Sequence, residues 1–284
     1  MKKIIILGDN GLLGHYMLSV FNRKPIEGYD ILGINRKVID VTDTKQCQKL
    51  REIINIDDVV INCIGVLKHN IKQTGLANTL LINSWFPQYV SDICYNKFAT
   101  FIHICSDCVF TGKAGNYTEL DSPDARDYYA KTKSIHPTSG MIIRTSFIGE
   151  DNRPTAGGLI AWMKSQRPGT TINGYTNCIW NGVTALHLSR YIRNVIETKG
   201  IWVGLQHIYS SQSVTKAKLC HIINDIYDLK LNVIDIEASE ISGSYIPRGR
   251  VLDRTLKSIY KYNEMTDIVT QLKEMKLYNT NDSK

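Results

Sequence analysis

The sequence predicts an α/β fold in which helices cover both faces of a doubly wound parallel sheet, with a smaller lobe formed by the C-terminal part of the chain. Short apolar runs recur along the first half, and segments with the 3.6-residue periodicity of helices lie between them. Strands joined in this way by right-handed crossovers run parallel. The strand-like runs are residues 3–7, 31–34, 59–64, 101–105 and 141–145, and the clearest helical segments are residues 47–54 and 79–95.

The first strand leads into three glycines spaced three residues apart, Gly8, Gly11 and Gly14. In a strand-to-helix turn the first glycine allows the tight turn, the second lets the backbone approach a pyrophosphate, and the third lets the new helix pack closely on the sheet. The start of that helix offers unpaired N–H groups to the phosphates. We therefore expect a dinucleotide site lined by Gly8, Asn10, Gly11, Leu12, Leu13 and Gly14.

The end of the second strand bears on which dinucleotide is bound. It reads Asn35-Arg36, without the acidic residue that would accept the 2′-hydroxyl of the adenosine ribose. Arg36 would instead pair with a 2′-phosphate, which favours NADPH over NADH. Two alternatives stay open, namely that Arg36 is an ordinary exposed arginine and that the chain uses NAD.

The fourth strand is followed by Ser106, and a turn-rich segment then leads to Tyr129 and Lys133. On a helix these two residues lie four apart on one face, where the ammonium would favour the phenolate. A free phenol has a pKa of about 10, so we expect Lys133 to lower the pKa of Tyr129. With the Ser106 hydroxyl holding a substrate oxygen, the three side chains suit hydride transfer at a C–OH/C=O centre. A tyrosine and a lysine at this spacing are common, so the pair alone would be weak evidence.

The length of 284 residues exceeds that of a typical single core, so one large domain or two intimately joined domains are expected. We expect residues 1–150 to form the dinucleotide-binding domain, completed by about residues 177–205, and residues 151–284 to form mostly the substrate-binding lobe. Beyond the fifth strand, glycine and proline interrupt the pattern before a helix at about residues 185–198 and a strand-like run at residues 206–209. A cleft between the lobes would hold the substrate.

The composition argues against several classes of partner. The net charge of +7 comes from scattered lysines, without the basic stripe and interleaved aromatics that nucleic-acid binding needs. No apolar run would span a bilayer and no charged-then-apolar leader opens the chain, so we expect no membrane contact and a cytoplasmic location. The seven cysteines, an odd number, indicate reduced thiols. Cys105 and Cys108 have the C-x-x-C spacing, but no second pair completes a metal site.

With these motifs in order, the chain resembles the extended short-chain dehydrogenase/reductases, which have the Rossmann fold. Among them it is most similar to the RmlD-like dTDP-4-dehydrorhamnose reductases. The likeness covers nearly the whole length, and its motifs are specific in combination. Besides the glycine turn and the Tyr129/Lys133 pair, the matching pieces are residues 40–43 and 60–65, Asn83 with Pro87, and residues 106–112, 144–146 and 247–253.

The resemblance implies roles for these residues. Ser106 would donate to the substrate oxygen, Tyr129 would be the general acid, and Lys133 would bind the nicotinamide ribose and tune the phenol. The reaction would be reduction by NADPH of a nucleotide-linked 4-keto-6-deoxyhexose at C4, with a UDP-linked 2-acetamido-2,6-dideoxy sugar or a dTDP-sugar as substrate. Many relatives are dimers, so a homodimer is a further expectation. Other cofactor contacts would come from Asn35, Arg36, Asp40, Val41, Asn62, Cys63, Ile64, Gly65 and Asn83, and other substrate contacts from Lys68, Asp107, Cys108 and Arg250.

Cys108 departs from the simple reductases of the resemblance, in which this position often carries tyrosine. In related double-function enzymes such as GDP-fucose synthase, a cysteine at this place moves a proton at the carbon next to the ketone. A thiol with a pKa near ~8.5, lowered beside cations, suits that task, so Cys108 would add C3 epimerisation. The second proton carrier would be Lys164. The alternatives are a small buried apolar residue at Cys108 and a surface lysine at Lys164.

Other departures and other functions stay open. His136-Pro137 follows where relatives commonly have Gly-Glu, so we expect the helix that carries Lys133 to end early. A non-catalytic regulatory subunit would bind a dinucleotide without turnover, although the intact Ser106, Tyr129 and Lys133 argue against it. A redox-neutral nucleotide-sugar 4-epimerase would hold NAD tightly and consume none.

Overall fold

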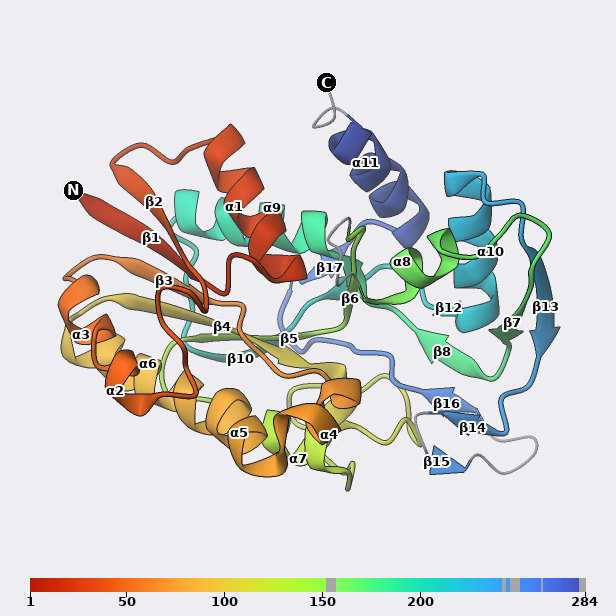
Figure 1. Ribbon diagram of the computed structural model, residues 1–284, viewed down its shortest axis with the longest axis horizontal. Helices are drawn as coiled ribbons and strands as arrows, with labels where there is room; N and C mark the ends of the chain where they lie inside the picture. The colour runs from red at the N-terminus through yellow and green to blue at the C-terminus, as the bar shows by residue number, and fades with distance from the viewer. Residues whose placement is uncertain (152–156, 242–243, 246–250, 262, 281–284) are drawn as a thin grey trace. The chain divides into compact units, whose positions relative to one another are not determined.

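The computed structural model describes residues 1–151, 157–241, 244–245, 251–261 and 263–280 (Figure 1). Contacts between residues divide the chain into two compact units. The first comprises Met1–Val109, Pro123–Arg144 and Leu188–Gln206, and the second comprises Phe110–Ser122, Thr145–His187 and His207–Lys284. The assignment of residues 1–150, completed by about residues 177–205, to a dinucleotide-binding domain and of residues 151–284 mostly to a substrate-binding lobe stays a prediction.

The first unit is built around one sheet. Its strands are β1 (Lys2–Leu7), β2 (Tyr29–Ile34), β3 (Val59–Asn62), β4 (Thr100–Ser106), β5 (Met141–Thr145) and β10 (Gly204–His207). Among the described residues their order is β10-β5-β4-β3-β1-β2, and β4, β3, β1 and β2 pair in parallel. The order of the strands reverses between β1 and β3, and dinucleotides bind at such a point of a doubly wound sheet. All five strands predicted for the first half of the chain are present.

Burial on both faces explains why these strands read as apolar runs. β3 is buried along its whole length, and β1 from Ile4 onward. On one face, Phe86 and Val90 of a helix belong to the same core cluster as Leu7 and Val60 of the sheet. The loss of apolar surface to water in such clusters is the main stabilising contribution to the fold.

Helices cover the sheet on both sides. They are α1 (Leu12–Arg23), α2 (Thr44–Cys47), α3 (Leu50–Ile53), α4 (Ile71–Thr74), α5 (Leu76–Leu80), α6 (Phe86–Asn96), α7 (Tyr128–Ser134) and most of α9 (Ala185–Glu197), with the single turns η1 (Lys68–Asn70), η2 (Leu81–Trp85) and η3 (Asp107–Val109). Figure 1 shows α1 and α9 on one face and α3 and α6 on the other.

Three of the helix predictions have informative outcomes. The helix expected over residues 47–54 is broken between α2 and α3, and the one expected over residues 79–95 contains the π-helical turn η2. The early end of the helix that carries Lys133 is confirmed, because α7 stops at Ser134, shortly before Pro137.

The described part of the second unit consists of short strands with α8 (Leu159–Lys164), α10 (Lys216–Tyr227) and α11 (Ile268–Thr280). α10 packs against a strand at Gly174, where a Cβ would lie 2.8 Å from Ala217 Cα. The strands pair as β6 (Phe147–Ile148) with β9 (Val183–Thr184), β7 (Thr171–Tyr175) with β13 (Asn232–Ile236), β11 (Tyr209–Ser210) with β17 (Glu264–Met265), β14 (Glu240–Ile241) with β15 (Ser244–Tyr245), and β8 (Cys178–Trp180) with both β12 (Val214–Thr215) and β16 (Leu252–Asp253).

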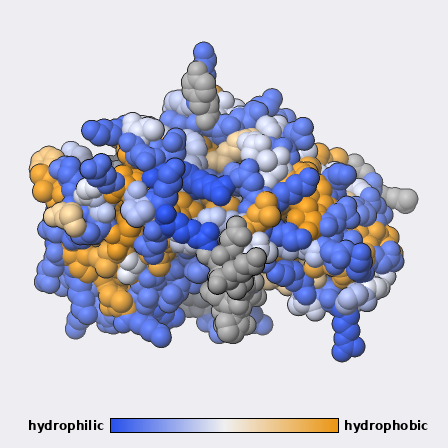
Figure 2. Space-filling view, turned by 90° about the horizontal axis from the view of Figure 1, so that it is seen from above, coloured by the Kyte–Doolittle hydropathy of each residue, from blue (hydrophilic) through white to orange (hydrophobic). Residues whose placement is uncertain are grey.

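The surface, the helix lengths and the cysteines bear on the partners of the molecule rather than on its fold. The face of the molecule in Figure 2 is mainly hydrophilic, with apolar residues in separate patches. In the part of the chain that the structure describes, no helix combines the length and apolarity needed to cross a membrane. The same residues contain no group of three or more His, Cys, Asp or Glu side chains placed to hold a metal ion. All seven cysteines are free thiols.

Candidate active site

The Tyr129 phenol and the Ser106 hydroxyl meet in the first unit. Ser106 is the last residue of β4, and Tyr129 lies in the first turn of α7. A hydrogen bond joins their side-chain oxygens, and the backbone N–H of Cys108 donates to Ser106 Oγ at 3.1 Å. Asp127 caps α7, since its side chain accepts the N–H of Ala130 at 3.1 Å. The two groups expected to act on a substrate oxygen therefore converge.

The pKa of Tyr129 is raised, and the expectation that Lys133 would lower it is wrong. Burial is the main cause, because only 8% of Tyr129 is exposed, and the neighbouring Cys108 and Asp107 add to the effect. The hydrogen bond from Ser106 acts in the opposite direction without reversing the shift. The phenol is therefore protonated, and able to act as an acid, throughout the neutral pH range.

Lys133 is buried beside the turn that follows β3. Only 7% of the residue is exposed, and burial lowers its pKa. A Cβ on Gly65 would lie 2.9 Å from Lys133 Nζ and 3.6 Å from Asn83 Oδ1. Because Gly65 has no side chain, the amine has room beside the backbone of this turn. The position suits binding of a ligand hydroxyl, and the largest effects on the pKa of Tyr129 come from burial and from groups other than Lys133.

A buried polar pair holds the same turn. Asn62 Oδ1 accepts the N–H of Ile64 at 3.0 Å, and Asn62 Nδ2 donates to His103 Nδ1 at 3.1 Å. Burial, with the nearby charge of Lys133, keeps the pKa of His103 well below its ordinary value, so the ring is neutral. Asn62 and His103 stand opposite each other on β3 and β4. Sequence reasoning missed His103, and only this register could have revealed it.

Asn83, which was expected to line the cofactor, is fully buried and uses its amide within the protein. Its Oδ1 accepts the N–H of Val66 at 2.8 Å, and its Nδ2 donates to Val66 O at 3.2 Å and to Thr132 Oγ1 at 3.1 Å. Thr132 in turn donates to the carbonyl of Tyr129 at 2.9 Å. Asn83 thus links the turn after β3 to the helix of Tyr129 and Lys133. The part played by Thr132 was not predicted.

The glycine loop after β1 fits a dinucleotide. Gly8 has a φ of +84°, and a Cβ there would lie 2.8 Å from Ile64 Cγ1. A Cβ on Gly14 would lie 2.1 Å from Gly8 O, so only glycine is accommodated. The N–H of Gly11 donates to Gly8 O at 2.8 Å, and α1 begins at the next residue. Residues 12–14 therefore carry the N–H groups of the first helical turn, which suit the binding of a pyrophosphate.

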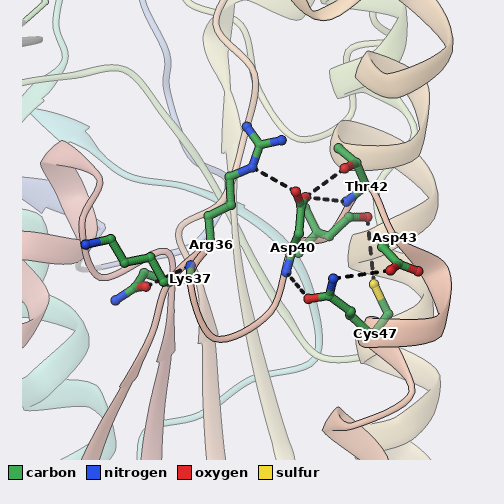
Figure 3. A network of polar contacts seen from close by, with 9 residues as sticks. Arg36, Lys37, Asp40, Thr42, Asp43 and Cys47 are labelled. Atoms are coloured by element: carbon green, nitrogen blue, oxygen red, sulfur yellow. Dashed lines mark hydrogen bonds and ion pairs between the residues drawn. The ribbon is translucent and has the colours of Figure 1, made fainter.

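Arg36 lies in the turn after β2, and 79% of its side chain is exposed. Its Nε donates to Asp40 Oδ2 at 2.9 Å, while its two terminal nitrogens point away from Asp40 (Figure 3). Burial acts to raise the pKa of Asp40, but hydrogen bonds from Thr42 and Arg36 outweigh it and lower the pKa. Val41 is buried in the core, and the side chain of Asn35 accepts a backbone N–H of the same turn. The turn therefore holds a guanidinium whose outer edge faces solvent.

Other predicted residues also lie near the phenol or near the cap of α7. Cys108 is partly exposed, its backbone N–H donates to Ser106 Oγ at 3.1 Å, and its charge adds to the rise in the pKa of Tyr129. Burial raises the pKa of Cys63 to about 12, so this thiol stays protonated. Lys68 donates to Asp127 Oδ2 at 3.1 Å. The backbone of Cys108 is therefore bonded to Ser106, and Lys68 supports the cap of α7.

Two further predicted residues, Lys164 and Arg250, come later in the sequence. Lys164 forms an ion pair with Glu150, and its ammonium lies 5.4 Å from the centroid of the Tyr227 ring. Glu150 also accepts hydrogen bonds from Tyr227 at 3.2 Å and from Asn279 at 2.9 Å. Lys164 is thus part of a polar cluster of its own unit. Arg250 lies outside the described residues.

Comparison with known proteins identifies relatives of this chain. The family model of the RmlD substrate binding domain matches residues 1–241. A dTDP-4-dehydrorhamnose reductase of Mycobacterium tuberculosis is 28% identical over 137 residues, which are 46% of this chain and 43% of that protein. The chain therefore spans less than half the length of that relative. A probable low-salt glycan biosynthesis reductase of Haloferax volcanii is 24% identical over 77% of this chain and 79% of its own length.

Solved structures with the same fold are also found. A dTDP-4-dehydrorhamnose reductase of Bacillus anthracis, solved in complex with NADP, superposes with a TM-score of 0.79 at 20% identity, over 98% of this chain and 99% of that one. A GDP-L-fucose synthetase of Naegleria fowleri bound to NADP gives a TM-score of 0.71 at 16% identity, over 99% and 93% of the two chains. At these identities the likeness establishes the extended Rossmann fold.

Proposed function

The chain belongs to the family of the RmlD substrate binding domain, and from that premise we propose that it is an NADPH-dependent reductase of a nucleotide-linked 4-keto-6-deoxyhexose. The observation that carries the proposal is the hydrogen bond between the Tyr129 phenol and the Ser106 hydroxyl, in the same unit as the glycine cradle. The reductase names of the relatives support the reaction class. The nucleotide is proposed as UDP or dTDP, with a UDP-linked 2-acetamido-2,6-dideoxy sugar as one substrate to test.

Each side chain has a separate task in the proposed reaction. A bound NADPH supplies the hydride that adds to C4 of the sugar. The Ser106 hydroxyl holds the C4 ketone oxygen, and Tyr129 gives that oxygen its phenolic proton as the carbonyl becomes an alcohol. Lys133 holds hydroxyls of the nicotinamide ribose from its place beside Gly65. The exposed edge of the Arg36 guanidinium pairs with the 2′-phosphate of NADPH.

The raised pKa of Tyr129 fits the direction of this reaction. Reduction needs an acid that still carries its proton at neutral pH, and burial ensures this. After transfer, the phenolate is a strong base and regains a proton readily. A phenol with a strongly lowered pKa would have favoured alcohol oxidation instead, because that direction starts from the phenolate.

The test compares Tyr129→Phe with Tyr128→Phe, a matched variant of the adjacent tyrosine, which is 62% exposed. Oxidation of NADPH is followed with a panel of nucleotide-linked 4-keto sugars. Removing the general acid should slow turnover by about 10²- to 10⁴-fold, with dinucleotide affinity retained, while Tyr128→Phe should match the unaltered protein. Equal turnover by the two variants would remove Tyr129 from the chemistry. Stoichiometric consumption of NADPH also separates a reductase from a redox-neutral epimerase and from a regulatory subunit.

A second activity, C3 epimerisation before reduction, is favoured by Cys108, a partly exposed thiol whose backbone N–H donates to Ser106 Oγ at 3.1 Å. The thiolate would take the acidified C3 proton, and Lys164 remains the proposed carrier on the opposite face. In deuterated water, epimerisation leaves deuterium at C3 of the product. Cys108→Ser should abolish that label while still consuming NADPH, and full labelling by the variant would exclude the proposal. Lys164→Met tests the second carrier in the same assay.

The proposed homodimer is tested separately. Sedimentation of the purified chain at several concentrations reports the mass of the species in solution. A monomer at all concentrations would contradict the proposed homodimer.

A further inference from the structure

Asp9, the residue between the first strand and the glycine cradle, has a buried carboxylate that is short of hydrogen-bond donors. Only 9% of the residue is exposed. Its Oδ1 is buried and has no hydrogen-bond partner among the described residues. Its Oδ2 accepts one long contact of 3.4 Å from Asn35 Nδ2. A carboxylate can accept about four hydrogen bonds, and one that is buried without them is destabilising unless a ligand supplies a donor.

This carboxylate lies at the carboxyl end of β2. A Cβ on Gly33 would lie 2.3 Å from Asp9 Oδ2, so the absence of a side chain at Gly33 leaves the space that the carboxylate fills. Gly33 pairs with Ile6, three residues before Asp9 on the adjacent strand. Asp9 therefore reaches across from the loop after β1 to the end of β2.

The end of β2 is where a dinucleotide-binding sheet recognises the adenosine ribose. An acidic side chain about 20 residues after the glycine turn usually accepts the 2′-hydroxyl. Here that place carries Asn35-Arg36, and the carboxylate comes from Asp9 instead. Because the contact of Asp9 Oδ2 with the Asn35 amide is long, at 3.4 Å, a ribose hydroxyl at Oδ2 would give the carboxylate a stronger hydrogen bond than the one it has.

We propose that Asp9 determines the specificity of the chain for the dinucleotide. Its carboxylate accepts a hydrogen bond from the 2′-hydroxyl of the adenosine ribose of NADH, and its negative charge repels the 2′-phosphate of NADPH. The inference rests on the proposed function and deepens it. Arg36 is the opposing determinant, since its exposed edge attracts the phosphate that Asp9 repels. The chain therefore binds both dinucleotides, and the balance between Asp9 and Arg36 sets the ratio of their affinities.

The test measures binding of NADPH and NADH by fluorescence titration without any sugar. Asp9→Asn keeps the shape of the side chain and removes its charge, so it should raise the preference for NADPH at least tenfold, a change of about 1.4 kcal/mol. Arg36→Gln should shift the preference towards NADH. The matched control is Asp30→Asn, which neutralises an exposed carboxylate near the amino end of β2 and should leave the ratio unchanged.

A second measurement uses the unaltered protein and does not depend on the variant folding. An NADH analogue that lacks the 2′-hydroxyl of the adenosine ribose should bind about tenfold more weakly than NADH. This difference in affinity should vanish in Asp9→Asn. Equal affinity of the unaltered protein for the two compounds would overturn the proposal, as would an Asp9→Asn variant that weakens NADPH and NADH by the same factor. If the proposed reaction is wrong, turnover is absent while these binding ratios stand, so the two failures are distinguishable.

Discussion

Gly65→Ala should damage catalysis while leaving the fold almost intact. The added Cβ would lie 2.9 Å from Lys133 Nζ, whereas ordinary contacts begin at 3.4 Å. The amine must therefore move by about 0.5 Å or more, which is easy for the end of a flexible side chain but harmful to its contact with a ligand. Because a misplacement of about 1 Å can cost about 10²-fold in rate, we expect kcat/KM to fall by about 10- to 100-fold.

The assay measures NADPH oxidation together with thermal unfolding. The free energy of unfolding should change by less than about 1 kcal/mol, since no backbone atom must shift. Gly200→Ala is the matched control, because a Cβ there meets its nearest neighbour at 3.5 Å, an ordinary contact. If Gly65→Ala retains full kcat/KM, the buried amine of Lys133 is not part of the site. If it unfolds instead, the turn after β3 is more rigid than the geometry implies.

Three further predictions concern pH and packing. Burial raises the pKa of Tyr129 above 10.0. The rate of carbonyl reduction should therefore be constant through neutral pH, and the rate of alcohol oxidation should increase up to strongly alkaline pH. An oxidation rate that stops increasing near neutral pH would contradict this. His103 is held neutral, and the unfolded chain binds its proton more readily, so the free energy of unfolding should fall below pH 6.5 and His103→Gln should reduce that fall in denaturation experiments. Phe86→Ala, at a fully buried site, should cost about 3–5 kcal/mol in the same assay.

Much of the sheet could be predicted because burial on both faces leaves a continuous apolar run in each strand. The helices were harder to predict than the strands. The segment expected as one helix over residues 47–54 is interrupted where the N–H of Arg51 donates to Gln48 O at 2.9 Å, a tight turn that periodicity does not reveal. The turn η2 inserts an extra residue at Leu81–Trp85, inside a segment whose apolar spacing is typical of an ordinary helix.

The site could be predicted only in part. Spacing along the chain predicted that Tyr129 and Lys133 share a helix, and the end of β4 predicted that Ser106 meets the Tyr129 phenol. The predicted direction of the pKa shift of Tyr129 was wrong, because the shift depends mainly on burial, which the spacing of residues along the chain does not report. The bonds from Asn62 to His103 and from Asn83 to Thr132 join residues 41 and 49 positions apart, so they depend on the folded register.

The most direct test of the account follows the hydride itself. The protein is incubated with NADPH that carries deuterium at nicotinamide C4 and with nucleotide-linked 4-keto sugars, and the products are read by NMR. We expect deuterium at C4 of the sugar with the unaltered protein and with Tyr128→Phe, and almost none with Tyr129→Phe. Deuterium at C4 at an equal rate with Tyr129→Phe, or no transfer to any sugar of the panel, would contradict the central claim that this phenol and serine serve carbonyl reduction.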